Sequence, residues 1–71
     1  MLRVGTRFKV NENMTLVHDG DDELIGETGI VVKMCDWIYP VQEVKFDNEA
    51  IQKHYIELGK RHFDEWELSP L

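Results

Sequence analysis

Four side chains in this sequence carry the donor atoms that zinc prefers. They are His18, Cys35, His54 and His62. Zinc sites usually take two ligands from a short spacing, such as Cys-x-x-Cys or two histidines a few residues apart. No pair among the four has such a spacing, so a site would require the fold to gather distant residues. The sequence therefore predicts no metal site, and the same argument disfavours a Cys–His nucleophile.

A cluster of carboxylates occupies the polar stretch 18–23. It consists of Asp19, Asp21, Asp22 and Glu23. Carboxylate oxygens bind Ca²⁺, but the spacing is not that of an EF-hand loop, and no glutamate stands where that loop needs one. A solvated acidic loop is the favoured interpretation.

The glycine pair at 26 and 29 does not form a phosphate-binding loop. The stretch Gly26-Glu27-Thr28-Gly29 lacks the lysine and Ser/Thr that such a loop needs, and no helix is expected after it. Pairs of carboxylates are numerous only because the composition is acidic. A chain of 71 residues also leaves little room for a water-excluding active site. We therefore expect a protein that is not an enzyme and needs no cofactor.

The segment between two expected strands, residues 34–40, is unusually apolar for a loop. It contains Trp37, Ile38 and Tyr39. Loops lie at the surface and often carry binding residues, and exposed aromatic side chains are enriched at interfaces. Two interpretations stay open: the loop binds a partner, or it covers the open end of a small barrel. Trp66, near the C-terminus, is expected in the core.

The alternation of apolar and polar residues indicates which elements position these groups. It is strict over residues 3–10, which is typical of a half-buried strand. Two glycines then introduce the apolar run 28–34. Strands are predicted at 3–10, 28–34, 41–46, 51–56 and 63–68, with 14–17 as a short strand or an irregular arm and with a 3₁₀ turn as the alternative at 63–68. Residues 51–56 also have helical spacing, but Asp47-Asn48 is typical of a hairpin link and favours a strand.

Length and composition suit one small globular domain spanning residues 1–71. Apolar residues make up 42% of the chain and charged residues 31%, which is ordinary for a soluble domain. No apolar run approaches the roughly 18–20 residues that span a bilayer, and no secretory signal is recognisable. The single cysteine, Cys35, excludes an internal disulfide, so we expect a reducing, cytoplasmic location.

The net charge of −6 limits the kinds of partner. A protein that tracks a nucleic-acid backbone needs lysine and arginine to neutralise phosphates, so the acidic excess argues against nucleic acid. The same charge favours a basic protein partner.

Three motifs together resemble the SH3-like small β-barrels, of the KOW type and the Mind-bomb/HERC type. The motifs are Val4-Gly5-Thr6-Arg7-Phe8, Gly26-Glu27-Thr28-Gly29-Ile30-Val31-Val32 and Val44-Lys45-Phe46-Asp47-Asn48, followed by a tail with Tyr55, Gly59 and Phe63-Asp64. The resemblance implies an all-β barrel or roll of five to six strands. It also implies a groove in which Trp37, Tyr39 and Tyr55 contact an extended peptide.

These observations lead to one main functional hypothesis and three alternatives. The main hypothesis is a non-catalytic regulatory module that binds a protein partner through Trp37, Ile38, Tyr39 and Tyr55. The first alternative is an acidic mimic of nucleic acid, of the kind some phages encode, that inhibits a DNA- or RNA-binding enzyme. The second is a KOW-like nucleic-acid-binding module with a basic strip at Arg3, Arg7, Lys9, Lys60 and Arg61. The third is a homo-oligomer that pairs through an edge strand.

Overall fold

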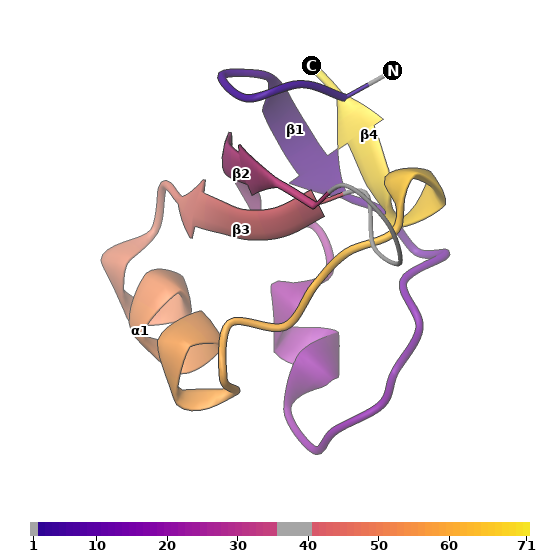
Figure 1. Ribbon diagram of the computed structural model, residues 1–71. Coiled ribbons are helices and arrows are strands. Elements are labelled where there is room, and N and C mark those ends of the chain that lie inside the picture. The colour runs from indigo at the N-terminus through magenta and orange to yellow at the C-terminus, as the bar shows by residue number, and fades with distance from the viewer. Residues whose placement is uncertain (1, 36–40) are drawn as a thin grey trace.

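The computed structural model describes residues 2–35 and 41–71. Within these ranges four strands form one antiparallel sheet in the order β3-β2-β1-β4 (Figure 1). The strands are β1 (Arg7–Val10), β2 (Thr28–Met34), β3 (Val41–Phe46) and β4 (Leu68–Pro70). The helical elements are the 3₁₀ helices η1 (Asp21–Leu24) and η2 (Glu65–Glu67) and the α-helix α1 (Glu49–Glu57). None of these helices is long and apolar enough to cross a membrane.

The strands β2 and β3 follow the predicted ranges 28–34 and 41–46, which are confirmed. Gly29 stands where β2 lies between its two neighbours, opposite Phe8 of β1 and Phe46 of β3. A Cβ atom at this position would collide with the backbone carbonyl oxygen of Lys45 and would lie 3.0 Å from the Phe8 ring. Only glycine therefore allows the strands to approach this closely.

This close approach predicts that Gly29→Ala destabilises the protein. Because the obstructing atom belongs to the backbone of β3, the sheet itself must shift, and we expect a loss of about 1–3 kcal/mol in the free energy of unfolding. Urea unfolding followed by circular dichroism measures it. Lys33→Ala is the control, since Lys33 is an exposed residue of the same strand and should change the stability by less than about 0.5 kcal/mol. A Gly29→Ala variant as stable as the wild type would contradict the packing argument.

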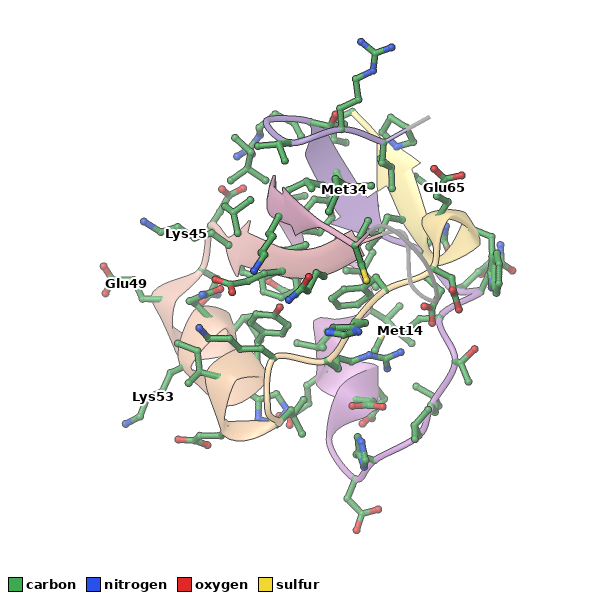
Figure 2. The ribbon with its side chains drawn as sticks, in the orientation of Figure 1. Met14, Met34, Lys45, Glu49, Lys53 and Glu65 are labelled. Atoms are coloured by element: carbon green, nitrogen blue, oxygen red, sulfur yellow. The ribbon has the colours of Figure 1, made fainter. Side chains whose placement is uncertain are left out.

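The core is a cluster of buried apolar side chains. Figure 2 shows side chains crowded between the sheet and the helical segments. The Phe46 ring makes T-shaped contacts with three aromatic rings, with centroid distances of 5.8 Å to Phe8, 5.4 Å to Tyr55 and 6.4 Å to Phe63. Edge-to-face contacts of this kind stabilise a core beyond the area they bury. The buried apolar residues are Leu2, Phe8, Val10, Met14, Leu24, Val31, Val41, Val44, Phe46, Tyr55, Phe63 and Leu68.

The predicted strand at 51–56 is wrong, because these residues belong to helix α1. The side-chain oxygen of Asn48 accepts hydrogen bonds from the amides of Ala50 and Ile51, at 2.9 and 3.3 Å. Asparagine at this position caps the free N–H groups of the first helical turn. The Asp47-Asn48 pair that suggested a hairpin is therefore the start of a helix.

The predicted all-β barrel of five to six strands is confirmed only in part. The described chain is mostly sheet, with four antiparallel strands and one helix, and β3 and β4 are separate edges rather than a closed ring. The first strand begins at Arg7 rather than at residue 3, and the segment 14–17 is an irregular arm. The predicted range 63–68 becomes the 3₁₀ turn η2 followed by β4, which pairs with β1.

Candidate functional site

The residues predicted to bind a partner fall into two groups. Trp37, Ile38 and Tyr39 lie outside the described residues. Tyr55 is fully buried, and its ring lies 6.2 Å from that of Phe63 in a stacked arrangement. Burial raises the pKa of its hydroxyl to about 12. Tyr55 is therefore a core residue with no exposed surface for a partner, which disfavours its prediction as a partner-binding residue.

The acidic loop is divided between solvent and core. Asp19, Asp22 and Glu23 are exposed, whereas Asp21 has no exposed surface. Glu23 Oε2 lies 3.1 Å from Nε2 of His54. Within the described ranges, no group of three or more histidine, cysteine, aspartate or glutamate side chains is placed to hold a metal ion.

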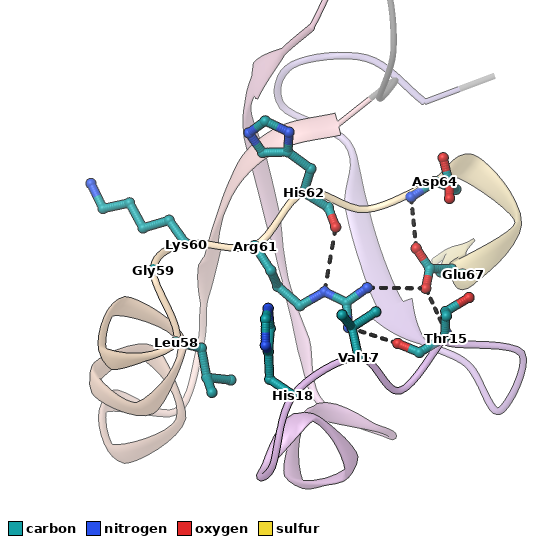
Figure 3. Close-up of a pocket in the computed structure, with 10 residues that line it drawn as sticks. All are labelled: Thr15, Val17, His18, Leu58, Gly59, Lys60, Arg61, His62, Asp64 and Glu67. Carbon is teal, nitrogen blue, oxygen red and sulfur yellow. Dashed lines mark hydrogen bonds and ion pairs between the residues drawn. The ribbon is translucent and has the colours of Figure 1, made fainter.

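An open pocket of about 480 Å³ lies beside this loop (Figure 3). One wall is the arm with Thr15, Val17 and His18, and the other is the segment from Leu58 to Asp64. His18 and His62, which the zinc hypothesis considered, both line it. Figure 3 shows the guanidinium of Arg61 between the two walls.

Arg61 joins the walls through a buried ionic network. Its Nη1 donates to the carbonyl oxygen of Thr15 at 2.8 Å and to Oδ2 of Asp21 at 2.9 Å. Its Nη2 donates to Oε2 of Glu67 at 3.3 Å. The Arg61 side chain is 10% exposed, and the side chains of Asp21 and Glu67 are 0% and 1% exposed. The guanidinium also lies 5.1 Å from the centre of the Phe63 ring.

The two carboxylates of this network also hold the backbone of the arm. Asp21 Oδ2 accepts from the amides of Val17 and His18 at 2.8 and 3.0 Å, and Glu67 Oε2 accepts from the amide of Thr15 at 2.6 Å. Burial alone would raise the pKa of the Asp21 carboxyl, but the two amide donors and the guanidinium lower it below its ordinary value. The arm is thus fixed by side chains instead of by a strand partner.

Sequence reasoning missed this network because its members are far apart and individually ordinary. Asp21 belonged to an acidic run, and Arg61 to a proposed basic strip. With one guanidinium and two carboxylates, the network carries a formal charge of −1. Because the donors of Arg61 are already directed at protein oxygens, we assign the network a structural role in shaping the pocket.

A second open pocket, of about 380 Å³, contains an exposed tryptophan. It is lined by Leu2, Glu65, Trp66, Leu68 and Pro70, which we call the Trp66 surface. Trp66 is 62% exposed, so its prediction as a core residue is wrong. A strand through 63–68 would have placed residues 66 and 68 on one face, whereas the 3₁₀ turn directs Glu67 and Leu68 inward instead.

The backbone that carries Trp66 is fixed from several sides. The Asp64 amide donates to Oε1 of Glu67 at 2.8 Å, and the Glu67 amide donates to the Asp64 carbonyl at 3.0 Å. Asn11 Nδ2 donates to the carbonyl oxygen of Trp66 at 2.8 Å. A large exposed indole is therefore presented by a turn that is already ordered, so binding through it would require little ordering of the backbone.

Both outer edges of the sheet are occupied, which disfavours pairing through an edge strand. Pro70 of β4 has no N–H, and the Leu68 amide donates to the Glu65 carbonyl. Three amides on the outer edge of β3 donate within the chain. They are Val41 to the Phe63 carbonyl at 3.1 Å, Val44 to the Tyr55 hydroxyl at 3.3 Å, and Phe46 to the Gln52 side chain at 2.8 Å.

The basic strip is partly neutralised by contacts within the protein. Arg7 makes a two-pronged ion pair with Asp47, with nitrogen–oxygen distances of 2.8 and 2.6 Å. Hydrogen bonds from Arg7 and Thr28 lower the pKa of the Asp47 carboxyl to about 2. Arg61 is enclosed by two carboxylates. These ion pairs leave less positive charge to bind phosphates, which disfavours the nucleic-acid-binding hypothesis. The carboxylates of Asp21, Asp47 and Glu67 are also paired within the protein, so they cannot belong to an acidic array that imitates nucleic acid.

The comparisons with known proteins give no relative for this fold. No protein-family model, no curated protein and no solved structure matches the chain. Its class is therefore defined by the structure itself, as a small antiparallel sheet with one α-helix.

Proposed function

We propose that this protein is a non-catalytic module that binds a protein partner through the Trp66 surface. The observation that carries the proposal is the 62% exposure of Trp66 on a turn held by hydrogen bonds at both ends. Tryptophan is among the residues most enriched at the energetic centres of interfaces. The exposed Pro70 extends the apolar contact area beyond the indole.

The partner in this proposal is a basic protein, and Trp37, Ile38 and Tyr39 form a second partner-binding segment. The net charge of −6 supports a basic partner. The single cysteine supports a reducing cytoplasm as the place where the two proteins meet.

The fold in this proposal is a variant of the SH3-like barrels. Three features support it: a long polar segment between the first two strands, a 3₁₀ turn before the last strand, and the return of that strand to the edge of β1. In this variant helix α1 occupies the chain position where the residue pattern predicted a strand. The likeness concerns the chain path, so it does not define a ligand.

Substitution of Trp66 tests the proposed function. We expect Trp66→Ala to weaken partner binding by about 30-fold or more, which corresponds to the 2 kcal/mol of a typical interface hot spot. The measurement is affinity capture from native lysate with quantitative mass spectrometry, followed by titration of the captured protein. Val4→Ala is the matched control, because Val4 is equally exposed, at 62%, and lies outside the Trp66 surface.

Two further readouts make the result interpretable. Urea unfolding should show Trp66→Ala within about 0.5 kcal/mol of the wild type, as expected for an exposed position. Equal capture by Trp66→Ala and wild type would contradict the proposal. Capture of a nucleic-acid enzyme that is lost on replacing Asp19, Asp22 and Glu23 with amides, but not on Trp66→Ala, would favour the mimic hypothesis instead.

A further inference from the structure

The Trp66 surface combines an apolar floor with a single charged group. Leu2 and Leu68 are 4% and 3% exposed and lie in the pocket, with Pro70 beside them. Trp66 and Glu65 complete the lining, and no lysine, arginine or histidine is among the residues that line the pocket. Four of the five residues that line this pocket are apolar or aromatic, and the fifth, Glu65, is exposed and carries a negative charge.

We infer that the Trp66 surface receives a long basic side chain, arginine in preference to lysine, from the partner; this inference rests on the proposed function. Arginine and lysine carry an apolar stem of several methylene groups that ends in a cation. The stem matches the floor made by Leu2, Leu68 and Pro70. The cation matches the indole face of Trp66 and the carboxylate of Glu65.

The preference for arginine follows from the shape of its head group. A planar guanidinium stacks on an aromatic face and can donate to a carboxylate at the same time, whereas an ammonium is a compact and strongly hydrated charge. Tryptophan is the aromatic residue that attracts cations most strongly. The protein already contains this arrangement internally, because Arg61 lies 5.1 Å from the Phe63 ring centre and donates to Glu67.

The charge distribution of the protein supports the same occupant. The net charge of −6 attracts a basic segment from a distance, and the local carboxylate then selects the side chain that enters. An uncharged apolar side chain would contact Leu2, Leu68 and Pro70, but it would form no ion pair with the Glu65 carboxylate. The competing occupant, a neutral apolar group, is therefore an outcome that the test must distinguish.

Peptide titration of a single-tryptophan protein tests the inference. In a Trp37→Phe background Trp66 is the remaining indole, and its Nε1–H resonance and the amides of residues 65–68 report binding by NMR. The probes are one acetylated and amidated peptide of leucine and glycine residues with two central arginines, and its lysine and citrulline versions. Citrulline has the shape of arginine without its charge.

We expect the arginine peptide to bind at low salt with the smallest dissociation constant of the three. The citrulline peptide should bind at least about five-fold more weakly, because it loses both the cation–π attraction and the ion pair. Glu65→Gln should weaken the arginine peptide by about two- to five-fold, as for an exposed ion pair. Glu49→Gln is the matched control, since Figure 2 places Glu49 on α1, across the molecule from Glu65.

Three results would overturn the inference. They are equal binding of the arginine and citrulline peptides, a Glu65→Gln effect no larger than that of Glu49→Gln, and no shift of the Trp66 resonance with the arginine peptide. The proposed function is judged separately. If Trp66→Ala loses the captured partner but the arginine and citrulline peptides bind equally, Trp66 is part of the interface and the inferred preference for a cation is wrong. If the protein binds the arginine peptide selectively but Trp66→Ala captures the partner as well as the wild type does, the pocket binds arginine and the proposed function is wrong.

Discussion

Arg61→Met is expected to destabilise the protein by about 3–5 kcal/mol, which is the cost of breaking a buried ion pair from one side. The substitution retains much of the side-chain volume but leaves the carboxylates of Asp21 and Glu67 without their cation, at 0% and 1% exposure. A small domain of this length has a total stability of about 3–5 kcal/mol. The variant should therefore be largely unfolded at 25 °C, as measured by far-ultraviolet circular dichroism and urea titration.

A second substitution shows whether the loss comes from uncompensated charge. In Asp21→Asn/Arg61→Met the network regains the formal charge of −1 that it has in the wild type, and the asparagine oxygen can still accept from the amides of the arm. The amide nitrogen of the asparagine would replace Oδ1, which accepts no hydrogen bond within the described residues, so the exchange removes no existing hydrogen bond. We expect the double variant to be more stable than Arg61→Met alone. An Arg61→Met variant within about 1 kcal/mol of the wild type would mean that the network behaves like a surface ion pair.

The parts of the fold that could be predicted are those determined by local pattern. The range 28–34 is bounded by glycines, and the range 41–46 alternates, so both strands follow from neighbours in sequence. The range 51–56 has both strand and helical spacing, and the choice depended on whether Asn48 turned a hairpin or capped a helix. Its hydrogen bonds to the amides of Ala50 and Ile51 decide for the helix. Asparagine is common in both settings, so sequence alone did not separate them.

The functional surfaces were harder to predict because they depend on tertiary position. Trp66 was assigned to the core on the assumption of a two-residue period, and a single 3₁₀ turn is enough to rotate it into solvent. Asp21 is the buried one of the three aspartates, and its carboxylate accepts from the amides of Val17 and His18 and from Arg61, forty residues away in sequence. An acidic run gives no local signal that distinguishes its buried member from its exposed ones.

Tyr55→Ala is the second substitution with a large expected effect, and it distinguishes a core tyrosine from a partner-binding one. Tyr55 has no exposed surface, its ring contacts those of Phe46 and Phe63, and its hydroxyl accepts from the Val44 amide at 3.3 Å. Truncating a buried aromatic side chain costs about 3–5 kcal/mol, because it removes apolar contacts and leaves a cavity. Urea unfolding should show a variant close to or beyond the limit of folding.

Two milder variants assign this loss to its physical sources. Tyr55→Phe keeps the ring but leaves the Val44 N–H without the hydroxyl, so we expect a loss of about 1–3 kcal/mol and a folded protein that binds the partner like the wild type. Ile56→Ala, at a 50% exposed neighbour on the same helix, should change stability by less than about 0.5 kcal/mol. If Tyr55→Ala unfolded at the urea concentration of the wild type while losing the partner, the tyrosine would be a binding residue after all. If all three variants behave as expected, helix α1 has a structural role: it covers the core and accepts hydrogen bonds from the outer edge of β3. The surface that binds a partner then does not include Tyr55.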